Sequence, residues 1–399
     1  MSYLYNSLFG KKTGVPVVND QFQQKQFINK QQESSSELNV VNNNLQEKMM
    51  LTANPNAESD PVVFSSFSLI SALSMLLIGL TDETLNEIMS NLSISDKHKL
   101  FTKIVEITDV LNQSGFVKTS NVIMTKKEIP VMETYLQEAK KLGEHFYFNQ
   151  DEISALVNKV NDIVSQNTNG LIKKILSESD VNEKTFLVLL NTIYFKSEWA
   201  TKFDKYWTRP KPFYGLRKHA PAIVSMMRHS EKYFRYFENN EYQAISLPYQ
   251  NNDISMVVVL NNDKNEVPPI FNHEKMSDLL GSMQGCCVNV EIPKFEQETE
   301  LDLVPFFKQN GVKQLFKYMH ADDMIPRFDE QAVSVIKQKC KIIVHEDGTE
   351  AAAATAIVGF CLQSARLPPK KIYDFVADHP FSYHIVHKSG LILFSGVYQ

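Results

Sequence analysis

Hydrophobic residues follow two periods along this chain, and the change between them divides a helix-rich first half from a strand-rich second half. Apolar residues spaced by three or four positions predict helices at residues 38–51, 81–92, 97–111, 130–143, 156–176 and 273–283. Apolar runs rich in β-branched and aromatic residues predict strands at 117–124, 185–199 and 331–345, with several more between 213 and 260. A short strand leads into a buried helix at 62–80, and a strand, a turn and a helix follow one another at 288–316. This order favours one α+β domain.

Two of these segments carry more specific expectations. Residues 185–199 form a long, nearly continuous apolar run, which is typical of a central strand buried on both faces of its sheet. Residues 156–176 have helical spacing, but Asn169 and Gly170 interrupt them. We therefore expect a helix that stops at this pair and then resumes.

The run from Gly348 to Ala356 consists almost entirely of small residues and does not fit a single element. Its alanines favour a helix, whereas the strand-like segment before it favours an extended conformation. Read with a period of two, one set of positions is uncharged and can face a core, and the other carries the only charge. The uncharged set is Thr349, Ala351, Ala353, Thr355 and Ile357, and the other is Glu350, Ala352, Ala354, Ala356 and Val358. A segment that suits loop, helix and strand alike suits an element that changes state.

The composition is that of a folded globular protein. The 399 residues are 43% hydrophobic and 22% charged, with a net charge of −5, which gives no reason to expect nucleic acid or an anionic membrane as a partner. No apolar run reaches the length of about 18 residues that a transmembrane helix needs. Residues 1–37 are rich in Gln, Asn, Ser and Lys, so we expect a disordered extension before a single domain at 38–399.

The N-terminus lacks the basic start, apolar run and small-residue cleavage site of a secretory signal. The four cysteines are Cys286, Cys287, Cys340 and Cys361, and none is spaced as in a metal site or a CxxC motif. We expect free thiols in a reducing compartment, with Cys340 a small buried residue. The sequence thus predicts a cytoplasmic protein, or one secreted by a non-classical route.

Motifs of catalysis and of cofactor binding are missing from the sequence. It has no G-x-S-x-G nucleophile elbow, no H-E-x-x-H zinc motif, no P-loop and no G-x-G-x-x-G loop. Three histidines lie close together, but His384 and His387 would point to opposite faces of a strand. We therefore expect neither an enzyme nor a metal or other cofactor.

Two stretches near the C-terminus resemble serpins, the serine protease inhibitors. The hinge of an inhibitory serpin is similar to Glu346, Gly348, Thr349, Glu350, Ala351, Ala352, Ala353, Ala354 and Thr355. The C-terminal signature of the family is similar to residues 375–381 and 393–396. The resemblance extends from about residue 40 to the end of the chain. It implies the serpin fold, with about nine helices around about three β-sheets and an exposed reactive-centre loop at about 346–370.

This resemblance implies a suicide-substrate inhibitor of serine proteases. A target protease would cleave the exposed loop and form an acyl-enzyme, and the loop would then insert into the main sheet as an extra strand. Insertion would release the strain of a kinetically trapped native state and distort the protease before the acyl-enzyme hydrolyses. Inward-facing hinge residues have to be small and uncharged, as Thr349, Ala351, Ala353 and Thr355 are.

The distance from the hinge predicts the scissile bond. In many serpins the residue before the cleaved bond lies 14 residues after the hinge glycine, which selects Leu362 and the bond Leu362–Gln363. Leucine at this position resembles antichymotrypsin-type serpins and implies a chymotrypsin-like target, such as cathepsin G or chymase. Counting back from Pro380 instead selects Arg366 and a trypsin-like target, and Phe360 is a further alternative.

Residues that govern sheet opening in serpins also have counterparts in this sequence. They are Ser65, Ser68, Asn191 and Gln338 beneath the sheet, and Trp199 near the entry point of the loop, where plain core packing is the alternative. Serpins usually have proline in place of Ser66 and histidine in place of Gln338. Glutamine donates and accepts hydrogen bonds but does not titrate near neutral pH, so we expect sheet opening to depend only weakly on pH.

Other functions stay open at this stage. A non-inhibitory serpin would act as a carrier, chaperone or storage protein, but the small hinge residues favour inhibition. The same trap could act on a papain-like cysteine protease, and the missing motifs disfavour a hydrolase. The expected partner is a chymotrypsin-like serine protease, and the expected state is a monomer able to polymerise by loop–sheet insertion.

Overall fold

The computed structural model describes residues 38–49, 61–149, 151–216, 220–326, 331–349 and 371–399. Helices form in the segments where the apolar spacing predicts them. They are α2 (Ser66–Leu77), α3 (Asp82–Leu92), α4 (Lys97–Ser114), α5 (Glu133–Ala139), α6 (Ile153–Asn167), α7 (His273–Ser282) and α8 (Leu303–Gln309). Residues 38–49 are also helical, and the apolar residues of their periodic face are buried: Leu38, Val41, Leu45 and Met49.

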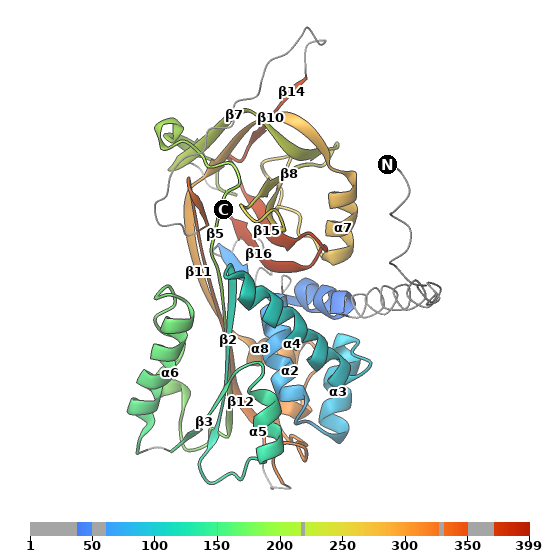
Figure 1. Ribbon diagram of the computed structural model, residues 1–399, viewed down its shortest axis with the longest axis vertical. Helices are drawn as coiled ribbons and strands as arrows, with labels where there is room; N and C mark the ends of the chain where they lie inside the picture. The colour runs from blue at the N-terminus through green and yellow to red at the C-terminus, as the bar shows by residue number, and fades with distance from the viewer. Residues whose placement is uncertain (1–37, 50–60, 150, 217–219, 327–330, 350–370) are drawn as a thin grey trace, which may run out of the picture.

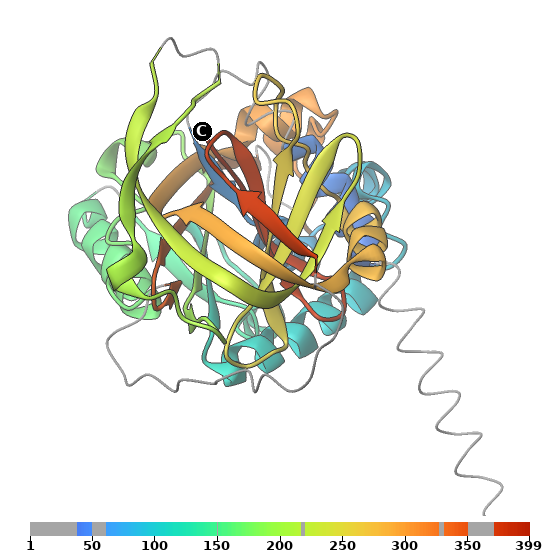
Figure 2. The ribbon, with the colours of Figure 1, turned by 90° about the horizontal axis from the view of Figure 1, so that it is seen from above.

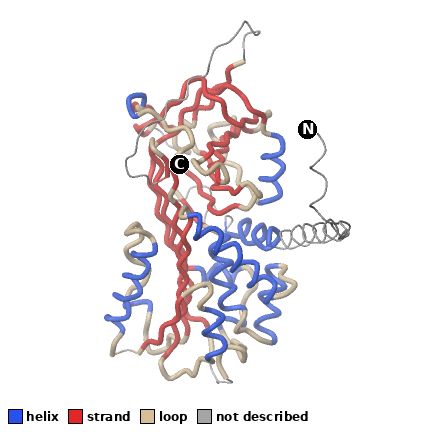
Figure 3. The backbone as a smooth tube through the Cα atoms, viewed as in Figure 1, coloured by secondary structure: helices blue, strands red, loops and turns tan. Residues whose placement is uncertain are grey.

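One long sheet, which we call the main sheet, runs through the molecule. Its seven strands are β2 (Val117–Lys126), β3 (Glu144–Phe148), β4 (Leu187–Phe195), β5 (Ser197–Glu198), β11 (Phe295–Asp302), β12 (Val333–His345) and β13 (Gly348–Thr349). The order is β3-β2-β4-β12-β13-β5, and β11 also pairs with β12. Figures 1 and 3 show this sheet edge-on, with α6 on one face and α2, α4, α5 and α8 on the other.

A second sheet of nine strands curves over one end of the molecule (Figure 2). Its strands are β1 (Val62–Phe64), β6 (Arg209–Phe213), β7 (Ala222–Glu238), β8 (Tyr242–Pro248), β9 (Ile254–Asn261), β10 (Gln284–Pro293), β14 (Ile372–Val376), β15 (Phe381–His387) and β16 (Ile392–Tyr398). The resemblance implied three sheets, whereas the described strands form two, the main sheet and this nine-stranded sheet. The 17-residue β7 holds the nine strands together, because it pairs with β6 at one end, with β8 at the other and with β10 along its length.

The α+β class is confirmed, but one expectation about a helix was wrong. Helix α6 ends at Asn167 and does not resume after Asn169 and Gly170. The Asn161 Oδ1 accepts from the backbone N–H groups of Ile175 and Leu176, at 3.0 and 3.1 Å. A side chain therefore satisfies backbone donors that a second helical segment would have paired internally.

Helix α2 lies under the middle of the main sheet and is buried along its whole length. It packs against β4 on one side and β16 of the second sheet on the other. All nine residues of β4 are buried, as predicted for a central strand. The opposite face of β4 is covered by α6, whose Val157, Val160 and Val164 join an apolar cluster with Val188 and Leu190. The N-terminus of α2 is thereby placed directly beneath the centre of the sheet.

Candidate functional site

The boundary between β4 and β12, which we call the seam, runs through the centre of the main sheet. The two strands are parallel, and residues 333–340 pair with residues 187–193. On the outer sides, β2 pairs antiparallel with β4 and β11 pairs antiparallel with β12. Over these residues the seam is a closed contact between two parallel strands.

A row of three side-chain amides crosses the seam. Gln338, Asn191 and Asn121 lie directly opposite one another on β12, β4 and β2. The Gln338 Nε2 donates to the Asn191 Oδ1 at 2.7 Å, and the Asn191 Nδ2 donates to the Asn121 Oδ1 at 2.7 Å. All three side chains are buried. Buried amides are costly when unpaired, so this row favours the register in which the three strands meet.

The N-terminus of α2 completes this network. The backbone N–H of Ser65 donates to the Gln338 Oε1 at 3.0 Å, and the Ser65 carbonyl accepts from the Gln338 Nε2 at 2.8 Å. The Asn191 Nδ2 also donates to the Ser68 Oγ at 2.6 Å. Ser65 caps α2, because its Oγ accepts from the backbone N–H of Ser68 at 3.0 Å. Separating β12 from β4 would therefore break contacts to α2 as well as the strand pairing.

The side chains of this network are amides and hydroxyls, and none of them titrates near neutral pH. Cys340 lies two positions further along β12 and is fully buried. Burial raises the pKa of its thiol, so Cys340 stays neutral. Its prediction as a small buried residue is confirmed.

The hinge end of the seam is occupied by β13, which pairs antiparallel with both β12 and β5. Thr349 is fully buried, and its Oγ1 lies 2.7 Å from the hydroxyl of Tyr249. Gly348 leaves no room for a side chain, because a Cβ atom there would collide with the carbonyl oxygen of Ser197. Since β5 follows directly on β4, strand β13 lies in line with the seam.

Trp199 ties the turn between β12 and β13 to the body of the molecule. Its ring stacks on Tyr249 with a centroid distance of 4.5 Å. The Trp199 Nε1 donates to the carbonyl of His345 at 2.9 Å, and its backbone N–H donates to the carbonyl of Asp347 at 3.0 Å. Trp199 is therefore a core residue that also bonds to the chain entering the hinge.

Two carboxylates of this turn are held by cations. Glu346 is 4% exposed, and its oxygens accept from the Thr208 Oγ1 at 3.0 Å and the Lys294 Nζ at 3.1 Å. Burial acts to raise the pKa of Glu346. Hydrogen bonds from its own backbone N–H, from Lys294 and from Thr208 outweigh burial, so the pKa is lowered. The Lys205 Nζ lies 2.7 Å from the Asp347 Oδ2 and lowers the pKa of that carboxyl. Both groups therefore stay ionised at neutral pH.

The structure brings together four of the residues singled out for sheet opening, namely Ser65, Ser68, Asn191 and Gln338. Trp199 lies instead at the hinge, beside Glu346, Gly348 and Thr349. The remaining predicted positions lie outside the described residues. They are Glu350, Ala351, Ala352, Ala353, Ala354 and Thr355 of the hinge, Leu362 and Gln363 of the predicted bond, the alternatives Phe360 and Arg366, and the cysteine Cys361.

Sequence reasoning missed Asn121 and the role of Tyr249. Asn121 carries the amide row from β4 to β2, and its Nδ2 donates to the Ser71 Oγ at 3.0 Å. The available signal was an asparagine inside a predicted strand, as Asn191 also is.

Among the described residues no group of three or more His, Cys, Asp or Glu side chains could hold a metal ion. No helix in the described part of the chain is long and apolar enough to span a membrane.

Comparison with known proteins identifies the family to which this arrangement belongs. The family model for the serpins, described as serine protease inhibitors, matches residues 41–399. The chain is a member of the serpin family. The family is described as one of protease inhibitors rather than of enzymes. The resemblance noted at the hinge and at the C-terminal signature is thus confirmed over most of the chain.

Related sequences come from distant organisms. A serpin-like protein of Acanthamoeba polyphaga mimivirus is 31% identical over 362 residues, covering 86% of each chain. The leukocyte elastase inhibitor of Xenopus tropicalis is 31% identical over 364 residues, covering 87% of this serpin and 94% of the relative. Among solved structures, Serpin48 of the insect Tenebrio molitor superposes with a TM-score of 0.75 at 26% identity, covering 92% of this chain and 97% of that one.

Proposed function

We propose that this serpin is a suicide-substrate inhibitor of serine endopeptidases, which it traps by inserting its cleaved loop into the seam. The observation that carries the proposal is the position of β13. This strand already lies between β12 and β5, antiparallel to both, at the end of a closed parallel seam. A chain that continued in the same direction would enter between β12 and β4.

The strand registers support this path from both sides. Thr349 pairs with Val344 of β12 and with Ser197 of β5. Continued for six residues, the register with β12 would place Thr355 opposite Gln338, and the register with β5 would place it opposite Asn191. The two registers agree, because Gln338 and Asn191 already face each other. Insertion to this depth would replace the direct Gln338–Asn191 hydrogen bond.

The same extension separates the two sets of hinge residues. Thr349 faces the interior and is fully buried, so every second residue after it would face the interior as well. These residues are Ala351, Ala353 and Thr355, which are small and uncharged. Insertion would exchange one parallel contact for two antiparallel ones and add a new set of backbone hydrogen bonds. This gain is the energy source that the trap requires.

We assign the scissile bond to Leu362–Gln363 and the target to the chymotrypsin-like serine proteases. The support is the 14-residue spacing from Gly348 and the apolar side chain of Leu362. A leukocyte elastase inhibitor among the relatives supports a serine protease as the class of target. A trypsin-like target at Arg366 and a papain-like protease are the alternatives. A cytoplasmic, monomeric protein is part of the same proposal.

Incubation with chymotrypsin, cathepsin G or trypsin tests the proposal. We expect a complex with a chymotrypsin-like enzyme that resists denaturing electrophoresis, and a released C-terminal peptide that begins at Gln363. A peptide beginning at Leu367 would move the bond to Arg366 and the target to trypsin-like enzymes. Cleavage without any stable complex would contradict inhibition and indicate a non-inhibitory serpin.

A further inference from the structure

A segment that we call the strap, residues 168–181, covers the outer face of the seam. It connects α6 to β4 and ends in the short helix η1 (Glu178–Asp180). Four apolar residues of the strap are buried against the sheet: Ile172, Ile175, Leu176 and Val181. Their cluster includes Val188 of β4 and extends to Val335 of β12, on the far side of the seam. A strand entering the seam would therefore pass directly beneath the strap.

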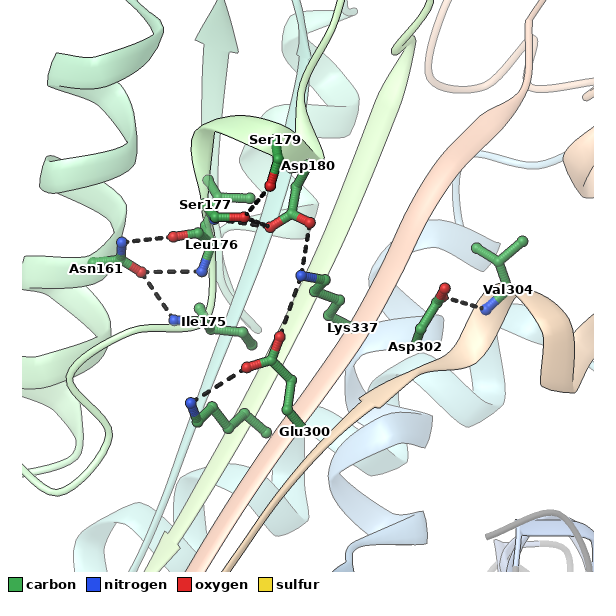
Figure 4. A network of polar contacts seen from close by, with 11 residues as sticks. Asn161, Ile175, Leu176, Ser177, Ser179, Asp180, Glu300, Asp302, Val304 and Lys337 are labelled. Atoms are coloured by element: carbon green, nitrogen blue, oxygen red, sulfur yellow. Dashed lines mark hydrogen bonds and ion pairs between the residues drawn. The ribbon is translucent and has the colours of Figure 1, made fainter.

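Two side chains of α6 hold the strap: Asn161, and Ser154, whose Oγ donates to the Glu178 Oε1 at 2.7 Å. The Asn161 Oδ1 accepts from the N–H groups of Ile175 and Leu176, and the Asn161 Nδ2 donates to the Leu176 carbonyl at 2.9 Å. Figure 4 shows this contact beside a second set of polar contacts that starts at the next residue, Ser177. The strap is thus held to α6 by these bonds and joined to β4 by the chain itself.

The second set of contacts crosses the seam. The Lys337 Nζ of β12 lies 2.7 Å from the Asp180 Oδ1 of the strap (Figure 4). The second carboxylate oxygen of Asp180 accepts from the backbone N–H and the Oγ of Ser177, both at 2.8 Å. Each side chain of the ion pair is 15% exposed. The two hydrogen bonds from Ser177 therefore fix the Asp180 carboxylate in the position from which it binds Lys337.

The pKa values of Asp180 and Lys337 are both shifted in the direction that keeps the two groups charged. Burial acts to raise the pKa of Asp180, but hydrogen bonds from Lys337 and Ser177 outweigh burial and lower it. Burial likewise acts to lower the pKa of Lys337, but Asp180 and Glu300 outweigh burial and raise it. Glu300 belongs to β11, and its Oε1 lies 3.2 Å from the Lys337 Nζ. Since β11 pairs with β12, Lys337 would keep this second partner if the seam opened.

We propose that the Asp180–Lys337 ion pair is a clasp that keeps the seam closed and sets the rate at which the cleaved loop inserts. This proposal rests on the proposed function, since it concerns the same insertion path. Insertion must move β12 away from β4 and the strap, which breaks the clasp. If the inserted chain kept the register of β13, residue 356 would lie opposite Lys337, on the face that meets the strap. The sequence has alanine at that position, and a small side chain would fit beneath the strap once the clasp had opened.

A neighbouring ion pair provides a matched control. Lys341 lies on the same face of β12, and its Nζ is 2.7 Å from the Glu296 Oε1 of β11. Both partners are on the same side of the seam, so this pair does not cross it. Removing the Lys341 charge costs an ion pair of the same length, although a more exposed one, without releasing the strap.

The test uses the uncleaved full-length protein and a labelled synthetic peptide with the sequence of residues 349–360. Asp180→Asn and Lys337→Met are each expected to raise the rate of peptide incorporation by about fivefold, the order of one partly buried ion pair. The double variant should match the single variants, because the same contact is lost in each. Lys341→Met should incorporate peptide at the wild-type rate. Unchanged rates in the clasp variants, or an equal rise in Lys341→Met, would overturn the proposal.

Hydrogen–deuterium exchange of the backbone amides of β4 and β12 provides a second measurement that needs no peptide. Faster exchange in Asp180→Asn and Lys337→Met than in Lys341→Met supports the clasp, and equal exchange contradicts it. Neither measurement involves a protease. Failure to form a protease complex would therefore count against the proposed inhibition alone, while these rates decide the clasp.

Discussion

Gln338 and Asn191 face each other across the seam, and the Gln338 Nε2 donates to the Asn191 Oδ1 at 2.7 Å. The contact joins two segments that are 147 residues apart in sequence. Because both groups are neutral amides, the strength of the contact does not change with protonation. The main sheet is thus held closed at its centre by hydrogen bonds that are insensitive to pH.

The first prediction concerns the pH dependence of sheet opening. The rate of thermal polymerisation of a His229→Gln variant, which lacks a buried histidine that gains a proton on unfolding, should differ by no more than about twofold between pH 5.5 and 7.5, because no group of the central network changes charge in this range. A Gln338→His variant places a titratable ring there, and protonating it in a buried site should make opening faster at pH 5.5, by about tenfold for each unit of pKa shift. A strong pH dependence of the His229→Gln protein would contradict this account.

The second prediction concerns the inward-facing hinge residues. Thr349→Arg places a charge where Thr349 is fully buried beside the hydroxyl of Tyr249, and burying an unpaired charge is costly. The variant should be cleaved by its target without forming a stable complex, which raises the stoichiometry of inhibition by about tenfold or more. Glu350→Arg is the control, since residue 350 would face outward if the inserted strand kept the register of β13. Equal loss of inhibition in both variants would count against the register.

A third prediction concerns Ser66, where serpins usually have proline. Ser66 is the first residue of α2, a position at which proline is favoured because the backbone N–H has no partner within the helix. The preceding Ser65 has φ −135° and ψ 106°, which a following proline allows. Ser66→Pro should therefore raise the free energy of unfolding by about 0.5–1 kcal/mol. Guanidinium denaturation measures the change, and Ser66→Ala isolates the effect of losing the hydroxyl. A midpoint at or below that of Ser66→Ala would contradict the argument.

The fourth prediction concerns global stability in mild acid. His229 is buried against Phe203, and burial lowers its pKa from 6.5 to about 4. Below pH 6.5 the unfolded chain binds a proton that the folded state does not, so the free energy of unfolding falls as the pH falls toward 4. This group should account for about 2 kcal/mol of lost stability between pH 7 and pH 5.

Denaturation midpoints at the two pH values test this linkage. His229→Gln should lose less stability on acidification than the unaltered protein, because the glutamine binds no proton. The control is His98→Gln, which removes an exposed histidine. A His229→Gln variant with the full acid sensitivity would show that other groups cause it. His384, whose pKa burial lowers to about 3, would be the next to examine.

The sequence alone determined the fold class, the order of most elements and the family. The continuous apolar run that became β4 was recognised from its length and composition, and the hinge run from its small residues. These features are local, so they can be read from neighbouring residues. The predicted resumption of α6 failed because Asn161, eight residues before Asn169, takes the backbone donors of Ile175 and Leu176. Helical spacing could not reveal that competition.

The tertiary structure decided which residues meet. Ser65, Asn191 and Gln338 lie on three separate elements, and only the register of β4 against β12 and the position of α2 bring them into contact. Asn121 joined this network for the same reason. Asp180 and Lys337 gave no signal in the sequence, since a charged residue on a strand or in a loop is ordinary. Their pairing depends on the path of the strap across the seam, which is set by packing between distant segments rather than by local propensity.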